Sequence, residues 1–136
     1  MGVNVRAYSK INLRLEVLGK RADGYHEVRM VMQMLRLWDN VYLASSRRNR
    51  IFSNHEFVPN NRNNLAMKAA ELMQAQYHMP PVDITIQKNI PVSAGMAGGS
   101  SDAAAVLLGM RELFDQRITI EDLCTLGEKL GSDVPF

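Results

Sequence analysis

The stretch Pro91–Ala104, which reads PVSAGMAGGSSDAA, decides how the fold of this chain is interpreted. Its glycines and serines stand between an alternating apolar segment and an apolar helical pattern. Glycine lets the backbone approach a ligand closely. The first amides of a helix have no partners within the helix and lie at the positive end of its dipole. The stretch therefore predicts a phosphate-binding loop that leads into a helix.

Two common phosphate-binding patterns do not match this stretch. A Walker A loop ends in Gly-Lys-Ser/Thr, whereas Gly99 is followed directly by Ser100. The dinucleotide fingerprint requires G-x-G-x-x-G, whereas Gly95 is followed by Met-Ala-Gly. A flexible surface turn is the alternative, but a turn does not need so many small residues running into a helix. We therefore expect backbone amides and hydroxyls to hold phosphate in a third architecture.

The composition indicates one globular domain with few special constraints. The chain has 136 residues, enough for a core, and a formal net charge of +2, too small to argue for nucleic acid or an anionic membrane. Cys124 is the single cysteine, so no internal disulfide can form. No apolar run approaches the ~20 residues of a membrane span, and the first residues lack a signal-peptide core. We expect a cytoplasmic protein.

Hydrophobic patterning predicts a mixed α and β chain with most strands in its first half. The segment 11–17 alternates apolar and polar residues, as does 82–87. Asp39-Asn40 is expected to form a turn. Strands are predicted over 3–8, 11–17, 25–37, 41–45, 51–57 and 82–87, and helices over 64–78, over 100–114 and from Thr119 onward.

Further motifs lie on both sides of the glycine-rich stretch. AYSKINLRLEV covers 7–17, KRADGYHEV covers 20–28 and LGSDVPF covers 130–136. In this order the motifs resemble the N-terminal half of the 4-diphosphocytidyl-2-C-methyl-D-erythritol kinases, a family of the GHMP kinase superfamily. The resemblance implies an α+β, ribosomal-protein-like two-layer fold with a mixed sheet packed by helices. It implies that 1–136 is the ATP-binding domain, and that the C-terminal domain of the family is absent from this chain.

The resemblance also implies an activity and its residues. The family uses ATP to phosphorylate the 2-hydroxyl of its cytidyl substrate, in the non-mevalonate route to isoprenoid precursors. The catalytic pair falls on Lys10 and Asp133, and the substrate-binding residues fall on Asn12, Tyr25 and His26. Magnesium is expected to bridge the ATP phosphates, with Ser100 or Ser101 as the candidate ligand and no choice made between them. The ATP-binding positions fall on Asn64, Lys88, Pro91, Val92, Ser93, Ala94, Gly95, Met96, Ala97, Gly98, Gly99, Ser100 and Ser101.

These roles are chemically consistent with one another. Asp133 would accept the proton of the acceptor hydroxyl, and Lys10 would keep Asp133 ionised and stabilise the forming alkoxide. Tyr25 offers a ring on which a cytosine can stack. The chain departs from the family at Tyr8-Ser9, which stand where Pro-Ala is usual and could shift the lysine.

Three other interpretations remain open at this stage. The chain could be a GHMP kinase with another acceptor, such as mevalonate or homoserine, although DGYHE argues against it. It could be an inactive remnant that folds, and that binds a nucleotide or self-associates. It could be an RNA-binding domain, against which the small net charge argues. We expect weak or no turnover from the 136 residues alone.

Overall fold

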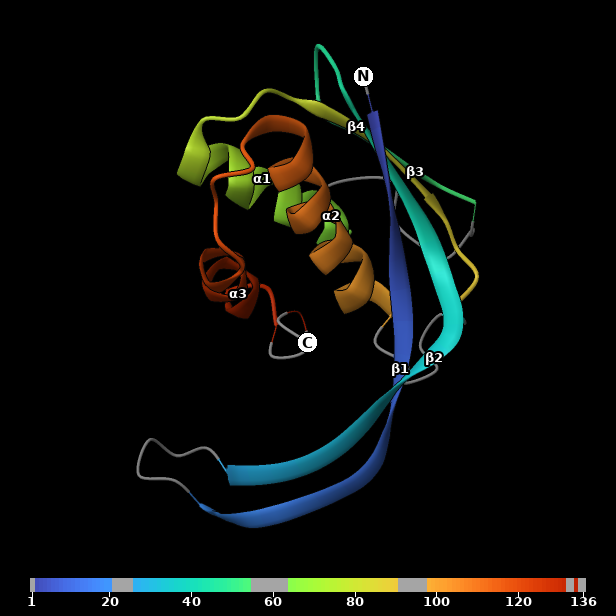
Figure 1. Cartoon of the computed structure of the whole chain (residues 1–136), viewed down its shortest axis with the longest axis vertical. Coiled ribbons are helices and arrows are strands. Elements are labelled where there is room, and N and C mark those ends of the chain that lie inside the picture. Colours follow the sequence, from blue (N-terminus) through green and yellow to red (C-terminus); the bar gives the residue numbers. More distant parts are fainter. Residues whose placement is uncertain (1, 21–25, 55–63, 91–97, 132–133, 135–136) are drawn as a thin grey trace.

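The computed structural model describes residues 2–20, 26–54, 64–90, 98–131 and 134. A curved sheet forms one layer and the helices form the other (Figure 1). The expected α+β fold, with a mixed sheet packed by helices, is confirmed. Within the described ranges, no helix combines the length and apolar character needed to cross a membrane.

The sheet is built on a long hairpin. It contains β1 (Gly2–Lys20), β2 (His26–Ser45), β3 (Arg50–Ser53) and β4 (Val82–Gln87), in the spatial order β1-β2-β4-β3. β1 pairs antiparallel with β2, β2 pairs antiparallel with β4, and β3 pairs parallel with β4. The far half of the hairpin extends beyond the helices (Figure 1).

The strand boundaries expected from the sequence are wrong in two places. The predicted strands 3–8 and 11–17 are one strand, β1, with a register shift between Tyr8 and Lys10. The predicted turn at Asp39-Asn40 lies inside β2, where Asp39 pairs with Ala7 and Asn40 pairs with Arg6. Turn propensity is overridden here because pairing with β1 continues on one side and pairing of Asn40 with β4 begins on the other.

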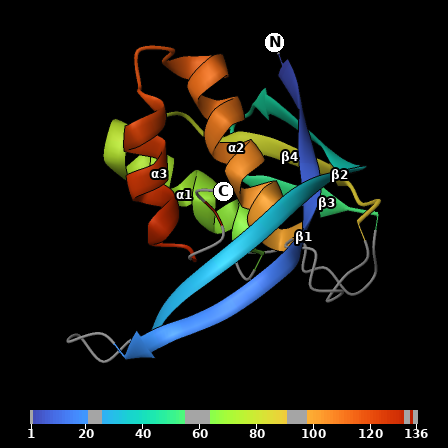
Figure 2. The ribbon, with the colours of Figure 1, turned by 60° about the horizontal axis from the view of Figure 1, so that its bottom comes forward.

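The helices are α1 (Leu65–Tyr77), α2 (Gly98–Phe114) and α3 (Ile120–Glu128). Asn64 caps α1 by accepting the Ala66 amide, and Thr119 caps α3 by accepting the Asp122 amide. α1 ends at His78, which adopts the left-handed conformation with φ 55°. Figure 2 shows α2 lying between α3 and the sheet.

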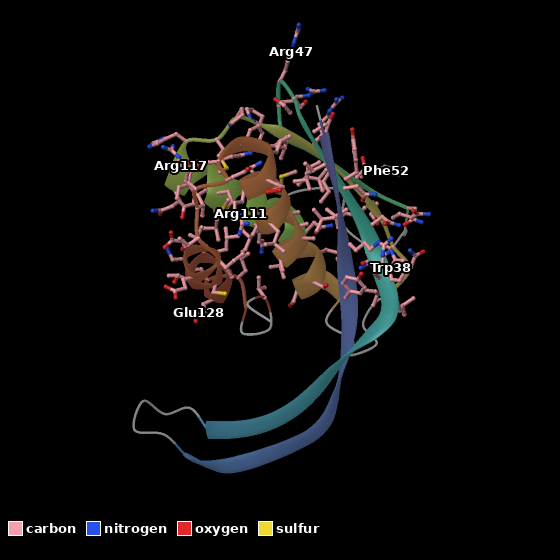
Figure 3. The ribbon with its side chains drawn as sticks, in the orientation of Figure 1. Trp38, Arg47, Phe52, Arg111, Arg117 and Glu128 are labelled. Carbon is pink, nitrogen blue, oxygen red and sulfur yellow. The ribbon has the colours of Figure 1, made fainter. Side chains whose placement is uncertain are left out.

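Alternation along the strands separates a buried face from an open face. Val82, Ile84 and Ile86 of β4 point into the core against the alanine- and methionine-rich faces of α1 and α2. On the opposite face, Tyr42 is 48% and Phe52 58% exposed. Figure 3 shows the labelled Phe52 on the side of the sheet away from the helices.

The closest contact between α2 and the sheet predicts a stability effect. A Cβ at Gly109 would lie 2.6 Å from Cδ1 of the fully buried Leu43, whereas a Cβ at Gly99 of the same helix meets nothing within 4 Å. We expect Gly109→Val to lower the free energy of unfolding by about 1–3 kcal/mol through overpacking. Urea denaturation measures this, with Gly99→Val as the matched control. An equal effect of both substitutions would contradict the packing at Gly109.

Candidate phosphate-binding site

The structure describes part of the predicted site. Gly98, Gly99, Ser100 and Ser101 form the first turn of α2, as a phosphate-binding helix start requires. Lys10 and Asn12 lie on β1, where they pair with Met34 and Met32 of β2, and His26 is the first residue of β2. These three residues are described by their backbone alone. Tyr25, Asp133 and the positions 91–97 lie outside the described residues, so their roles stay predictions.

The first turn of α2 has room for a ligand beside it. Gly99 is exposed, and a Cβ there would have open space around it. The turn contains no acidic residue that would repel an anion. Because the first amides of a helix lack intrahelical partners, this end can donate hydrogen bonds to an anion. The geometry therefore fits phosphate.

A serine joins the helix start to the strand that carries Lys10. The Ser101 hydroxyl donates a hydrogen bond of 2.6 Å to the Tyr8 carbonyl. The Tyr8 ring packs against Trp38, with 5.6 Å between the ring centroids. The bonded carbonyl lies two residues before Lys10 in the chain. The predicted phosphate-binding turn and the predicted catalytic lysine thus belong to neighbouring parts of the fold.

A buried ion cluster lies beside this turn. The Lys88 ammonium donates to Asp39 Oδ2 at 2.6 Å and to Asp102 Oδ2 at 2.9 Å. The side chains of Lys88, Asp39 and Asp102 are 5%, 0% and 4% exposed. We call these three residues the ion cluster. It joins β2, the residue after β4, and α2.

Asp39 also binds the backbone that precedes the glycine-rich loop. Its Oδ1 accepts the amide of Asn89 at 2.6 Å and the amide of Ile90 at 2.9 Å. The Asn89 side chain in turn donates to the Trp38 carbonyl at 2.9 Å. Residues 88–90 are therefore held to β2 by one carboxylate and one carbonyl.

Burial and neighbouring groups shift the pKa values of the two carboxyls in opposite directions. Burial, with the neighbouring Asp39 carboxylate, raises the pKa of Asp102 to about 8. Burial also disfavours the charge of Asp39, but hydrogen bonds from Asp102, Ile90 and Lys88 outweigh it and lower the pKa of Asp39. Burial opposes the Lys88 charge, and the attraction of Asp102 and Asp39 outweighs it and raises the pKa of Lys88. Near neutral pH the cluster thus holds an ammonium, one carboxylate and one protonated carboxyl.

Two residues that were predicted to bind ATP, Lys88 and Asn64, make contacts within the protein. The Lys88 ammonium contacts carboxylates inside the protein, and Asn64 uses its side chain to cap α1. Their contact with ATP stays a prediction. The sequence analysis did not single out Asp39 or Asp102. Asp39 lies in a dipeptide typical of turns. Asp102 follows two serines in a segment expected to bind phosphate through its backbone amides and hydroxyls.

A separate hollow of about 150 Å³ lies between α2 and α3. Cys124 is half-buried and lines this hollow. The lining is predominantly apolar, which does not suit a phosphate. Its lining residues are Ala104, Leu107, Leu108, Ile120, Leu123, Cys124 and Val134.

Comparison with known families supports the fold. Residues 64–136, which include α1, β4, α2 and α3, match the GHMP kinases N terminal domain. The chain belongs to the GHMP kinase family. The resemblance inferred from the motifs is confirmed at this level.

Individual relatives carry the name of one particular kinase within this family. The chain is 48% identical over 139 residues to a 4-diphosphocytidyl-2-C-methyl-D-erythritol kinase of Bacillus mycoides (strain KBAB4), covering 100% of this chain and 48% of the relative. It is 46% identical to the protein of that name in Lachnoclostridium phytofermentans (strain ATCC 700394 / DSM 18823 / ISDg), covering 98% of this chain and 47% of the relative. The chain thus spans about half the length of the curated relatives it matches.

Solved structures agree with these relatives. A crystal structure of 4-(cytidine 5'-diphospho)-2C-methyl-D-erythritol kinase superposes with a TM-score of 0.79 at 36% identity, covering 98% of this chain and 48% of that one. A homoserine kinase from Cytophaga hutchinsonii ATCC 33406 superposes with a TM-score of 0.72 at 13% identity, covering 95% of this chain and 40% of that one. The second likeness shows the fold alone.

The raised pKa of Asp102 predicts a pH-dependent stability. In the native state Asp102 keeps its proton up to about pH 8, whereas in the unfolded chain Asp102 loses it above the ordinary pKa of 3.8. The contribution of Asp102 to the free energy of unfolding is therefore fully present at low pH and is lost as pH rises toward about 8. Asp102→Asn cannot titrate. We therefore expect the stability of Asp102→Asn relative to the unaltered chain to improve steadily between pH 5 and pH 8.

Urea denaturation at pH 5, 6.5 and 8 measures this difference. Asp115→Asn is the control, because hydrogen bonds from Arg117 hold the pKa of Asp115 below its ordinary value, outside this pH range. A difference between Asp102→Asn and the unaltered chain that stays constant with pH would contradict the protonated state of Asp102.

Proposed function

We propose that this chain is the ATP-binding half of a kinase that phosphorylates the 2-hydroxyl of 4-diphosphocytidyl-2-C-methyl-D-erythritol. The observation that carries the proposal is the 48% identity to proteins of that name, which extends over the whole chain. The DGYHE and SKINL motifs, predicted to serve the acceptor, lie within the matched length. We propose residues 1–136 as one domain in the cytoplasm, acting on small molecules.

The described residues support the nucleotide part of this proposal. The first turn of α2 offers amide donors beside open space, and the ion cluster and Ser101 hold that turn against β2 and β1. Phosphoryl transfer depends mainly on positioning and on stabilising negative charge. A fixed row of amides at a helix start provides both functions for the ATP phosphates.

The proposed reaction transfers one proton and one phosphoryl group. Asp133 accepts the proton of the acceptor hydroxyl while the hydroxyl oxygen attacks the γ-phosphorus of ATP, and ADP leaves. Lys10 keeps Asp133 ionised and stabilises the developing alkoxide. Tyr25 and His26 hold the cytidyl group, and Asn12 lies near the acceptor.

Magnesium is proposed together with ATP. Among the described residues, no group of three or more metal-ligating side chains gathers at one place. Mg²⁺ in kinases binds largely through substrate phosphates and water with one or two carboxylates, so the donor set here is consistent with an ion that arrives with ATP. When bound, it would offset charge on the phosphates.

A chimeric kinase tests the proposed function. It joins these 136 residues to the C-terminal half of the Bacillus mycoides relative, and it is assayed with ATP, magnesium and the cytidyl substrate. We expect Asp133→Asn to lower kcat by about 10²–10⁴-fold because asparagine cannot accept the proton. The KM for ATP should stay nearly unchanged. Asp115→Asn, a half-buried position just after the far end of α2, serves as the control and should retain full activity.

The same assay separates the proposed roles. Lys10→Ala should also lower kcat, because it removes charge that favours ionised Asp133 and the alkoxide. Tyr25→Ala should mainly raise the KM for the cytidyl substrate, since stacking acts in ground and transition states alike. Full activity of Asp133→Asn would remove the proposed base. Turnover of homoserine or mevalonate in preference to the cytidyl substrate would replace the proposed acceptor.

A further inference from the structure

We propose that Asp39, Lys88 and Asp102 are positioning residues that set the distance between the two ends of the phosphate-binding segment, so that the first amides of α2 meet the ATP phosphates. The inference rests on the proposed function for its ligand. It adds Asp39 and Asp102, to which the sequence motifs assigned no role, and it gives Lys88 a positioning role.

The cluster holds the entrance to the segment. Asp39 accepts the consecutive amides of Asn89 and Ile90, and Ile90 directly precedes the first glycine-loop residue in the chain. The Lys88 amide donates to the Asn54 side chain at 2.8 Å. Backbone held at successive residues in this way has little freedom to shift along the strand direction.

The cluster also holds the exit from the segment. Asp102 lies on α2, one residue after Ser101, and receives the Lys88 ammonium at 2.9 Å. Ser101, in the same turn of α2 as Asp102, donates a hydrogen bond to the Tyr8 carbonyl. The contact between Lys88 and Asp102 therefore joins two residues that stand 14 positions apart in the chain, on either side of the phosphate-binding segment.

The lysine acts through these carboxylates. Its side chain is 5% exposed, and two of the three ammonium donors are taken by Asp39 and Asp102. Asp102 Oδ1 is buried and lacks a hydrogen-bond partner, which identifies Oδ2 as the oxygen that makes the connection. Breaking a buried pair is costly, so the connection is maintained whenever the fold is.

The test compares two substitutions of Asp102 in the 136-residue chain. Asp102→Ala removes the acceptor of the Lys88 ammonium, whereas Asp102→Asn keeps an oxygen in the same place. We expect Asp102→Ala to weaken ATP binding by at least about tenfold, because amides displaced from the phosphates lose charge-assisted hydrogen bonds. Asp102→Asn should remain within about threefold of the unaltered chain. Isothermal titration with ATP and magnesium gives the dissociation constants.

Controls separate positioning from general stability. Circular dichroism and urea denaturation establish that each variant folds, and Asp115→Ala repeats the substitution at a half-buried position just beyond the other end of α2. Lys88→Met breaks the same connection from the other side. If the cluster acts as one unit, Lys88→Met combined with Asp102→Ala should bind ATP no more weakly than Lys88→Met alone.

Each outcome bears on the proposal. Unchanged ATP affinity in folded Asp102→Ala would overturn the positioning role and leave the proposed function intact. Equal loss in Asp102→Asn and Asp102→Ala would also overturn it, because Asp102 would then act through its charge or its proton. Failure of the unaltered chain to bind ATP would overturn the proposed nucleotide site and this inference with it.

Discussion

The contact of one buried lysine with two buried carboxyls is the constraint on which the rest of the site depends. Lys88 Nζ lies 2.6 Å from Asp39 and 2.9 Å from Asp102, and all three side chains are shielded from water. An ammonium with one carboxylate and one protonated carboxyl is neutral overall, which limits the cost of burying the group. The arrangement connects the centre of the sheet to the start of α2.

This connection is what we propose to position the start of α2 for phosphate binding. Glycines and serines alone make a backbone permissive, and a permissive backbone does not place its amides. Here the backbone before the segment is fixed by Asp39, and the backbone after it is fixed by Asp102 and Ser101. The described residues on either side of the segment are thus held to the same sheet.

The sequence predicted the parts of the fold that depend on local patterns. Alternation identified β4, and Asn64 and Thr119 were correctly placed at or near helix starts because caps are local interactions. The length of β1 and β2 could not be predicted locally, since their continuity comes from pairing between residues far apart in the chain. Asp39 shows the same limit. Asp-Asn favours a turn in isolation, and only the amides of Asn89 and Ile90 make a buried strand position favourable.

The most direct measurement follows the amide resonances of Gly98, Gly99, Ser100 and Ser101 by nuclear magnetic resonance during titration with a non-hydrolysable ATP analogue and magnesium. If the start of α2 binds the phosphates, these amides shift in a saturable way, and in Asp102→Ala they do not shift at the same analogue concentrations. Saturable shifts confined to the hollow between α2 and α3, or to the open face of the sheet, would contradict the account.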